Sequence, residues 1–158
     1  SRRPLLHEPH KLHIGFMNIM GDALHNFTDG LVIAASYLIS IPVGVATTLA
    51  VILHEIPQEL ADFGVLIYSG FSRKKALFLN FASATTAILG AVLGLIIGNS
   101  SQLFSKLMVP FAAGGFLYIA GANLIPELHK ECDWKTSLGH FIAMIAGIGL
   151  MVALLYLE

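Results

Sequence analysis

Five long apolar runs joined by short polar segments constrain this chain more than any other feature. The runs lie near 12–39, 43–68, 76–98, 107–126 and 138–157. Each has about the 20 residues that an α-helix needs to cross the hydrocarbon core of a bilayer. The joints are too short to form domains, so consecutive helices should be antiparallel. The sequence therefore predicts an all-α membrane bundle of five transmembrane helices over 12–158, preceded by a polar tail over 1–11.

The composition agrees with a lipid bilayer as the surroundings. Charged residues make up 12% of the chain and hydrophobic residues 56%, whereas a water-soluble domain has about a quarter of its residues charged. The formal net charge of -1 gives no reason to expect a nucleic-acid partner. The single Cys132 excludes an internal disulfide and a Cys-rich zinc module. We therefore expect the function to lie within the helices.

The Lys and Arg residues predict how the bundle is oriented. Of nine such residues, only Lys106 falls on one face of the predicted topology. The other face holds Arg2, Arg3, Lys11, Arg73, Lys74, Lys75, Lys130 and Lys135. Because basic residues collect on the cytoplasmic side, we expect the amino-terminal end in the cytoplasm and the carboxyl-terminal end outside the cell or in a lumen. This rule does not distinguish the plasma membrane from an organelle membrane.

Polar side chains interrupt the first two apolar runs. They are Asp22, His25, Asn26 and Asp29 in the first, and His54, Glu55, Gln58, Glu59 and Asp62 in the second. A carboxylate at mid-membrane costs roughly 2.5 kcal/mol or more. None of the five runs contains a Lys or Arg. Protons, water or a metal ion must therefore offset the negative charge.

The spacing of these residues favours a metal ion. At about 100° per residue, the first set falls within an arc of about 100° and the second within about 140°. A short hairpin can point both faces at one site. Imidazoles and carboxylates one helical turn apart suit a borderline cation such as Zn²⁺, whereas calcium and magnesium sites use oxygen almost exclusively. Asp22, Glu59 and Asp62 are expected to support this site or line its mouth.

Glycine and proline mark other positions in the predicted helices. Pro57 removes a helical hydrogen bond, and Gly30 follows Asp29 directly, so both are candidate hinges for a moving helix. Glycines at four-residue spacing in the third run, at 90, 94 and 98, predict close contact with another helix. The glycines at 114, 115 and 147 predict similar contacts in the last two runs.

Two motifs resemble those of a known family. His25-Asn26-Phe27-Thr28-Asp29-Gly30 and His54-Glu55-Ile56-Pro57-Gln58-Glu59 are similar to the fourth- and fifth-helix metal motifs of the ZIP family of divalent-metal transporters. The form HNFTDG followed by HEIPQE is closest to the LIV-type zinc transporter branch, whose second pattern is usually HEXPHE. The resemblance continues through Asn80 and Ser83, and then from Phe111 to Glu127, so it covers nearly the whole chain.

The resemblance implies an eight-helix transporter of which this chain holds helices four to eight. A binuclear site would lie between the fourth and fifth helices, with metal-contacting places at His25, Asn26, Asp29, His54, Glu55 and Gln58, and with Glu59 as an extra acid. The partners would be the divalent ion, the bilayer, and either the three missing helices or a second copy. From the residues alone, His7, His10 and His13 are expected to belong to a solvated tail, whereas the resemblance would give them a part in receiving or sensing the exiting ion. Gln58 departs from the branch pattern, which puts a second metal position in doubt and opens iron or manganese beside zinc as substrate.

We therefore expect a transporter, not an enzyme, that moves a divalent ion toward the cytosol. Two alternatives remain open. HEIPQ begins like the HExxH motif of a zinc metalloprotease, with Glu55 as the general base, but the second His is absent and Pro57 disturbs the helical spacing. The other alternative is an accessory half-protein that binds metal without transporting it. His129 and His140 lie near predicted helix ends and need no role in either case.

Overall fold

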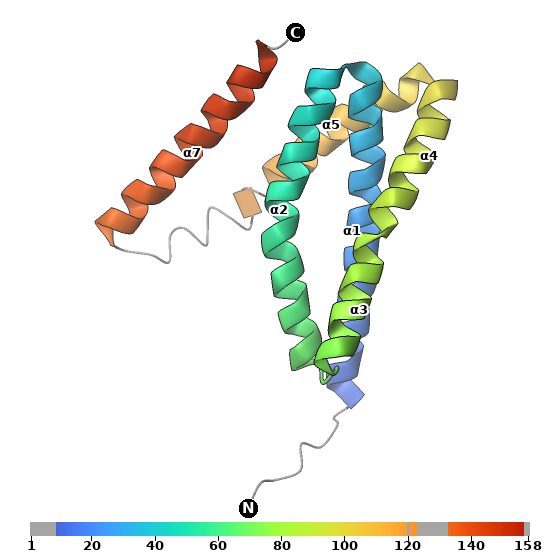
Figure 1. Ribbon diagram of the computed structural model, residues 1–158, viewed down its shortest axis with the longest axis vertical. Helices are drawn as coiled ribbons and strands as arrows, with labels where there is room; N and C mark the ends of the chain where they lie inside the picture. Colours follow the sequence, from blue (N-terminus) through green and yellow to red (C-terminus); the bar gives the residue numbers. More distant parts are fainter. Residues whose placement is uncertain (1–8, 120, 123–132, 157–158) are drawn as a thin grey trace, which may run out of the picture.

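The computed structural model describes residues 9–119, 121–122 and 133–156, and these contain helices but no strand (Figure 1). The helices are α1 (Pro9–Ile39), α2 (Ile41–Tyr68), α3 (Arg73–Ala84), α4 (Thr86–Ser100), α5 (Gln102–Ile119) and α7 (Trp134–Leu155). By length and composition, two stretches are each able to cross a membrane: Ile41–Tyr68, which is α2, and Arg73–Ser100, which is α3 followed by α4. The protein is the all-α helix bundle that the sequence predicts.

A single residue joins α1 to α2. Ser40 has extended backbone angles and caps α2, its hydroxyl accepting a hydrogen bond from the Val43 amide at 3.4 Å. Pro42 lies in the first turn of α2, where a missing amide proton costs nothing. This tight hairpin places α1 and α2 side by side and antiparallel (Figure 1).

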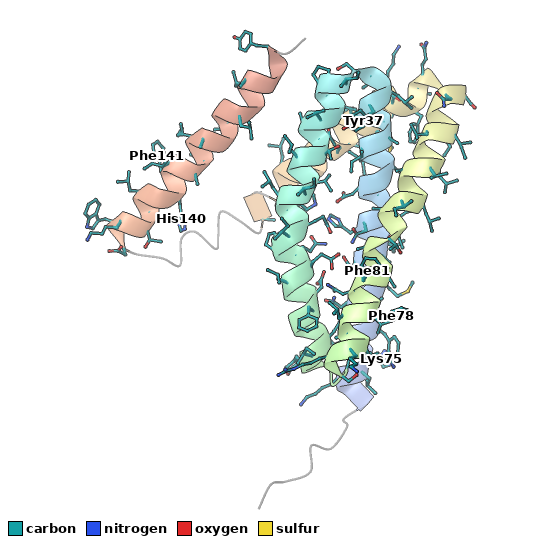
Figure 2. All side chains as sticks on the ribbon, in the orientation of Figure 1. Tyr37, Lys75, Phe78, Phe81, His140 and Phe141 are labelled. Carbon is teal, nitrogen blue, oxygen red and sulfur yellow. The ribbon has the colours of Figure 1, made fainter. Side chains whose placement is uncertain are left out.

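A small cluster of buried hydrophobic residues, one part of the core, lies at the opposite end of the bundle. Gly70 has a φ of 93°, which suits a residue without Cβ, and it turns the chain from α2 into α3. Leu66, Phe71 and Ala76 form a buried cluster there, and the Phe16 ring of α1 meets the Phe71 ring edge to face at 5.6 Å between centroids. The core therefore ties α1, α2 and α3 together at this end, where Figure 2 also places Lys75.

Helices α1 and α4 approach each other through glycine. A Cβ on Gly30 would overlap the carbonyl oxygen of Ala87, and a Cβ on Gly90 would overlap the carbonyl oxygen of Phe27. Side chains from α1 also occupy the space beside Gly94 and Gly98. The glycine spacing in the third run therefore marks a helix contact, as predicted.

The third apolar run, expected as one helix over 76–98, is observed as two helices that meet at Thr85. Hydroxyl groups around the break donate to main-chain carbonyls of their own helix: Ser83 to Asn80 at 2.9 Å, and Thr85 to Ala82 at 2.6 Å. Such bonds compete with the helical ladder and bend it. The Thr86 hydroxyl also donates to the carbonyl of Ala23 at 2.7 Å, which fastens the break to α1.

The last helices make fewer contacts than the first four. Helix α5 crosses beside α1, and α7 lies apart with α2 as its neighbour (Figure 1). A Cβ on Gly114, Gly115 or Gly147 would meet no atom within 4 Å among the described residues. The close contacts predicted at these three glycines are thus not formed within the described part of the chain.

Candidate metal site

The hairpin at Ser40 brings the two predicted polar faces to the same depth. His25 and His54 lie about 15 residues from the turn, on either side of it, so both sit about 21–22 Å along their helices. Asp29 lies one helical turn closer to Ser40 than His25, and Glu55 directly follows His54. Asp29 is buried, and the other three side chains are partly buried. The structure thus brings together four side chains that the sequence predicted to share a site.

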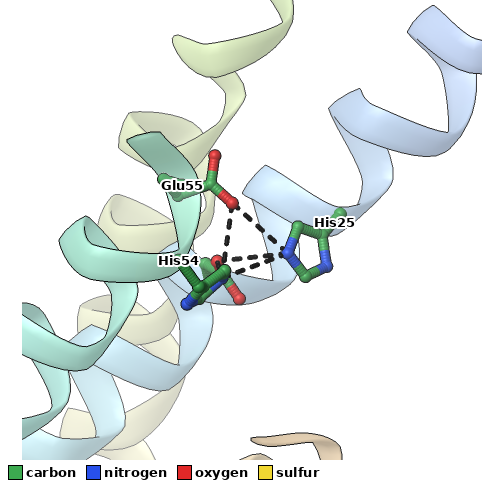
Figure 3. A group of neighbouring side chains, drawn as sticks. His25, His54 and Glu55 are labelled. Carbon is green, nitrogen blue, oxygen red and sulfur yellow. Dashed lines mark hydrogen bonds and ion pairs between the residues drawn. The ribbon is translucent and has the colours of Figure 1, made fainter. Parts of the chain in front are cut away.

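Four potential ligand atoms of these side chains converge (Figure 3). His54 Nε2 lies 3.1 Å from Asp29 Oδ2 and 3.4 Å from Glu55 Oε1. His25 Nε2 lies 3.6 Å and 3.3 Å from the same two oxygens, and 3.3 Å from His54 Nε2. A tetrahedral zinc ion with bonds of about 2.0–2.1 Å has ligand atoms about 3.3–3.4 Å apart. These five separations therefore match five of the six edges of a zinc tetrahedron, and the sixth, between the two carboxylate oxygens, is at most 4.8 Å.

The hydrogen bond of His54 favours a ligand role for its Nε2. His54 Nδ1 lies 2.9 Å from the carbonyl oxygen of Ala50 one turn earlier. When Nδ1 donates its proton to this carbonyl, Nε2 presents a lone pair, as in most metal-binding histidines. Two protonated imidazoles would instead place like charges about 3.3 Å apart, at His25 and His54. A cation between them removes this conflict.

The predicted ligands Asn26 and Gln58 do not join the four atoms in the same way. Asn26 is buried, and its amide donates to Asp22 Oδ1 at 2.8 Å and to the Asp22 carbonyl at 3.2 Å. Gln58 is partly buried, and its side chain forms no hydrogen bond within the described part of the chain. Their assignment as metal ligands stays a prediction.

The three acids predicted to support the site divide into two groups. Asp22 and Glu59 offer oxygens within 4.8 Å of each other and of an oxygen of Glu55. Asp62 lies further along α2 and accepts a hydrogen bond from Asn18 at 3.0 Å. Asp22 and Glu59 therefore form a cluster with Glu55, whereas Asp62 lies outside this cluster.

Sequence reasoning missed two residues that position these acids. Asn18 pairs with Asp62, and Asn80 of α3 donates to the Glu59 carboxylate and to its carbonyl, the latter at 3.0 Å. Asn18 lies four residues before Asp22, so extending the polar face of the first run would have found it. Asn80 was noted only through the family resemblance, since a lone Asn in an apolar run carries no periodic signal.

The two other histidines whose side chains the structure describes lie away from the four convergent atoms. His13 is exposed on the first part of α1, and His140 lies on α7, away from the α1–α2 pair (Figure 2). The side chains of His7, His10 and His129 fall outside the described residues. The role expected for His7, His10 and His13 in receiving an ion therefore stays a prediction.

The candidate hinges occupy different surroundings. Gly30 is buried against the α4 backbone, so it has a packing role in this conformation. Pro57 is exposed inside α2, which continues as a helix from Ile41 to Tyr68. Whether either position moves stays a prediction.

The sequence profile described as "ZIP Zinc transporter" matches residues 7–155 of the chain. This range includes α1 and α2 and all four convergent side chains. No solved structure matches the chain.

Curated relatives agree with this family. The chain is 39% identical to zinc transporter zipt-7.2 of Caenorhabditis elegans, over 86% of the chain and 30% of the relative. It is 38% identical to zinc transporter ZIP13 of Danio rerio, over 93% and 43%, and 40% identical to IAA-alanine resistance protein 1 of Arabidopsis thaliana, over 93% and 32%. The chain thus spans less than half the length of these relatives. It belongs to the ZIP zinc transporter family and is an integral membrane protein.

Proposed function

We propose that this chain forms the metal-binding part of a transporter that carries a divalent ion, foremost zinc, across the membrane. The substrate would be held by His25 and Asp29 of α1 and by His54 and Glu55 of α2. The observation that carries the proposal is the convergence of two imidazole nitrogens and two carboxylate oxygens at separations of 3.1–3.6 Å. The carboxylates would offset the lost hydration of the ion, and the imidazoles would favour zinc over harder cations.

The distribution of basic side chains supports an orientation in which the end of the bundle opposite the Ser40 hairpin faces the cytoplasm. Lys11 of α1 lies with its Nζ 5.7 Å from the centre of the Tyr68 ring, and Lys75 of α3 lies 5.1 Å from that of Phe71. Both cations are thus at the end of the bundle opposite the Ser40 hairpin. Under the positive-inside rule this end faces the cytoplasm. An ion that entered from the other side would reach the four ligands before it reached this end.

Uptake of radioactive zinc into cells or vesicles that contain the whole protein tests the proposal. We expect His54→Ala to reduce uptake at least about tenfold, because it removes one of four ligands. His140→Ala is the matched control, since it removes a helical histidine away from the site, and it should leave uptake unchanged. Normal uptake by His54→Ala would refute the proposed site. Zinc binding without uptake by the wild-type protein would favour the accessory half-protein.

Competition with iron and manganese in the same assay decides the substrate preference. The His, His, Asp and Glu set favours zinc, and we expect zinc to compete best. The metalloprotease alternative is not favoured. The second imidazole of the site comes from His25 on another helix, and position 58, where HExxH needs a histidine, is Gln58.

A further inference from the structure

Four basic side chains collect at the end of the bundle opposite the Ser40 hairpin, which we call the basic end. Arg73, Lys74 and Lys75 form the first turn of α3, directly after the turn that leaves α2. Lys11 lies in the first turn of α1. All four side chains are exposed, and Figure 2 shows Lys75 at this end.

The backbone that carries these cations is held by packing and by hydrogen bonds. The Phe71 amide donates to the Leu66 carbonyl at 3.1 Å, and both side chains belong to the buried cluster at this end. Lys75 Nζ lies 5.1 Å from the centre of the Phe71 ring. Lys11 approaches the same turn from α1, with its Nζ 5.7 Å from the centre of the Tyr68 ring. The four cations therefore form one surface around the α2–α3 turn, which we call the basic surface.

No carboxylate among the described residues pairs with these cations. The ion pairs within the described ranges all join His25 or His54 to an acid of the metal site. On α2, Asp62 precedes Tyr68 by six residues, or about 9 Å of helix, and it is bonded to Asn18. The first turn of α3 contains no acid, although the positive end of the helix dipole lies there. The positive charge of the basic surface is thus not offset by the described part of the chain.

The length of α2 places the basic surface at the depth of lipid headgroups. Helix α2 has 28 residues and is therefore about 42 Å long, whereas the hydrocarbon core of a bilayer is about 30 Å thick. Both ends of α2 must then reach into the headgroup layers. Tyr68, its last residue, is exposed, and tyrosine is enriched at this boundary. The cations that surround Tyr68 are consequently within reach of lipid phosphate groups.

We propose that the basic surface binds the phosphate groups of anionic lipids in the leaflet at this end of the bundle. Each Lys or Arg beside an anionic membrane surface strengthens binding roughly fivefold. The guanidinium of Arg73 can hold a phosphate through two parallel hydrogen bonds. Lipid is favoured over an acidic protein segment because the surface lies at headgroup depth. None of the four cations belongs to the metal site, so the proposal does not depend on the transport function.

Native mass spectrometry of the purified whole protein tests the proposal by titration with phosphatidylglycerol or with phosphatidylcholine of the same acyl chains. We expect the wild type to bind phosphatidylglycerol at least about tenfold more tightly than phosphatidylcholine. The combined variant Arg73→Gln, Lys74→Gln and Lys75→Gln should lose this preference, whereas the charge-conserving variant Arg73→Lys should keep most of it. Equal binding of the two lipids by the wild type, or an unchanged preference in the combined variant, would overturn the proposal.

A pair of single variants gives the matched control. Lys74→Gln should weaken phosphatidylglycerol binding roughly fivefold. Lys106→Gln removes a cation near the start of α5, at the end of the bundle that holds the Ser40 hairpin (Figure 1), and it should bind this lipid like the wild type. Equal losses in the two variants would mean that only total charge matters, which would contradict a surface at the α2–α3 turn.

Two measurements on the wild-type protein make the test independent of variant folding. Phosphatidylglycerol with a photoreactive group on its headgroup should label residues 69–75 or the first turn of α1, and labelling confined to other segments would overturn the proposal. Glycerophosphoglycerol, which is the headgroup without acyl chains, should bind at least about tenfold more weakly than the lipid. Equal affinity would show that the surface takes a soluble phosphate and would refute its assignment to lipid.

Discussion

Zinc loading gives a bond-length prediction that follows directly from the distances between the four ligand atoms. The five measured separations among His25 Nε2, His54 Nε2, Asp29 Oδ2 and Glu55 Oε1 are 3.1, 3.3, 3.3, 3.4 and 3.6 Å. In a regular tetrahedron the edge is about 1.63 times the distance from centre to corner. The observed edges therefore correspond to bonds of about 1.9–2.2 Å, which brackets the values for Zn–N and Zn–O bonds. These five separations therefore need little change when the ion binds.

X-ray absorption spectroscopy of the zinc-loaded protein measures these bonds. We expect about four nitrogen and oxygen neighbours near 2.0–2.1 Å, with the outer scattering of two imidazole rings. His54→Ala should remove one of the two imidazole contributions and leave that of His25. Asp62→Asn should leave the spectrum unchanged, because Asp62 is engaged with Asn18.

Either of two spectra would refute this reasoning. A shell of about six oxygen neighbours without imidazole scattering would mean that zinc avoids the four convergent atoms. An unchanged imidazole contribution in both His25→Ala and His54→Ala would place the metal on other histidines, such as His140 of α7.

Three further predictions concern packing, protonation and the break between α3 and α4. Gly30→Ala should lower the free energy of unfolding by about 1–3 kcal/mol, because its Cβ would overlap the Ala87 carbonyl. Gly21→Ala is the control and should leave the free energy of unfolding unchanged, since a Cβ there meets no atom within 4 Å. Equal thermal stability of the two variants would contradict the packing role of Gly30. Zinc affinity, measured by calorimetry, should fall as pH drops below about 6.5, since protons and metal compete for imidazole lone pairs; a flat profile would argue against histidine ligands. Thr86→Val should lower the free energy of unfolding by about 1 kcal/mol, because it removes the hydroxyl hydrogen bond to α1. Thr28→Val removes a hydroxyl that bonds within its own helix, so it should lower the stability less in the same melting experiment.

The sequence predicted which side chains converge better than it predicted the residues that hold them in place. Helical periodicity was enough to place His25 and Asp29 on one face, and His54 and Glu55 on another. The one-residue turn at Ser40 then required the two faces to meet at one depth. The helix-contact role of the glycine at position 90 also follows from spacing alone, because small residues at four-residue intervals line one side of a helix.

Features that depend on a third helix were not predictable in this way. Asn80 holds Glu59 only because α3 returns beside α2, and the rotation of α3 about its axis is not encoded in periodicity. At the break, the Thr85 hydroxyl bonds within its own helix, but the neighbouring Thr86 hydroxyl donates to the Ala23 carbonyl of α1. The second bond depends on how two helices pack, which the sequence pattern does not give. Gln58 has the spacing of a ligand, but its side chain forms no hydrogen bond among the described residues, so spacing alone does not assign its role.

The hairpin also explains why the polar groups form a series along the α1–α2 interface. Because α1 and α2 leave Ser40 in opposite chain directions at the same rise per residue, residues equally far from the turn face each other. His25 faces His54, Asp22 lies near Glu59, and Asn18 bonds to Asp62 about 22 residues from the turn on each side. An ion that left the imidazole level would meet carboxylates at each following level toward the basic end. Because the donors change from nitrogen and oxygen to oxygen alone, a zinc ion would be held less tightly beyond the imidazole level than at it.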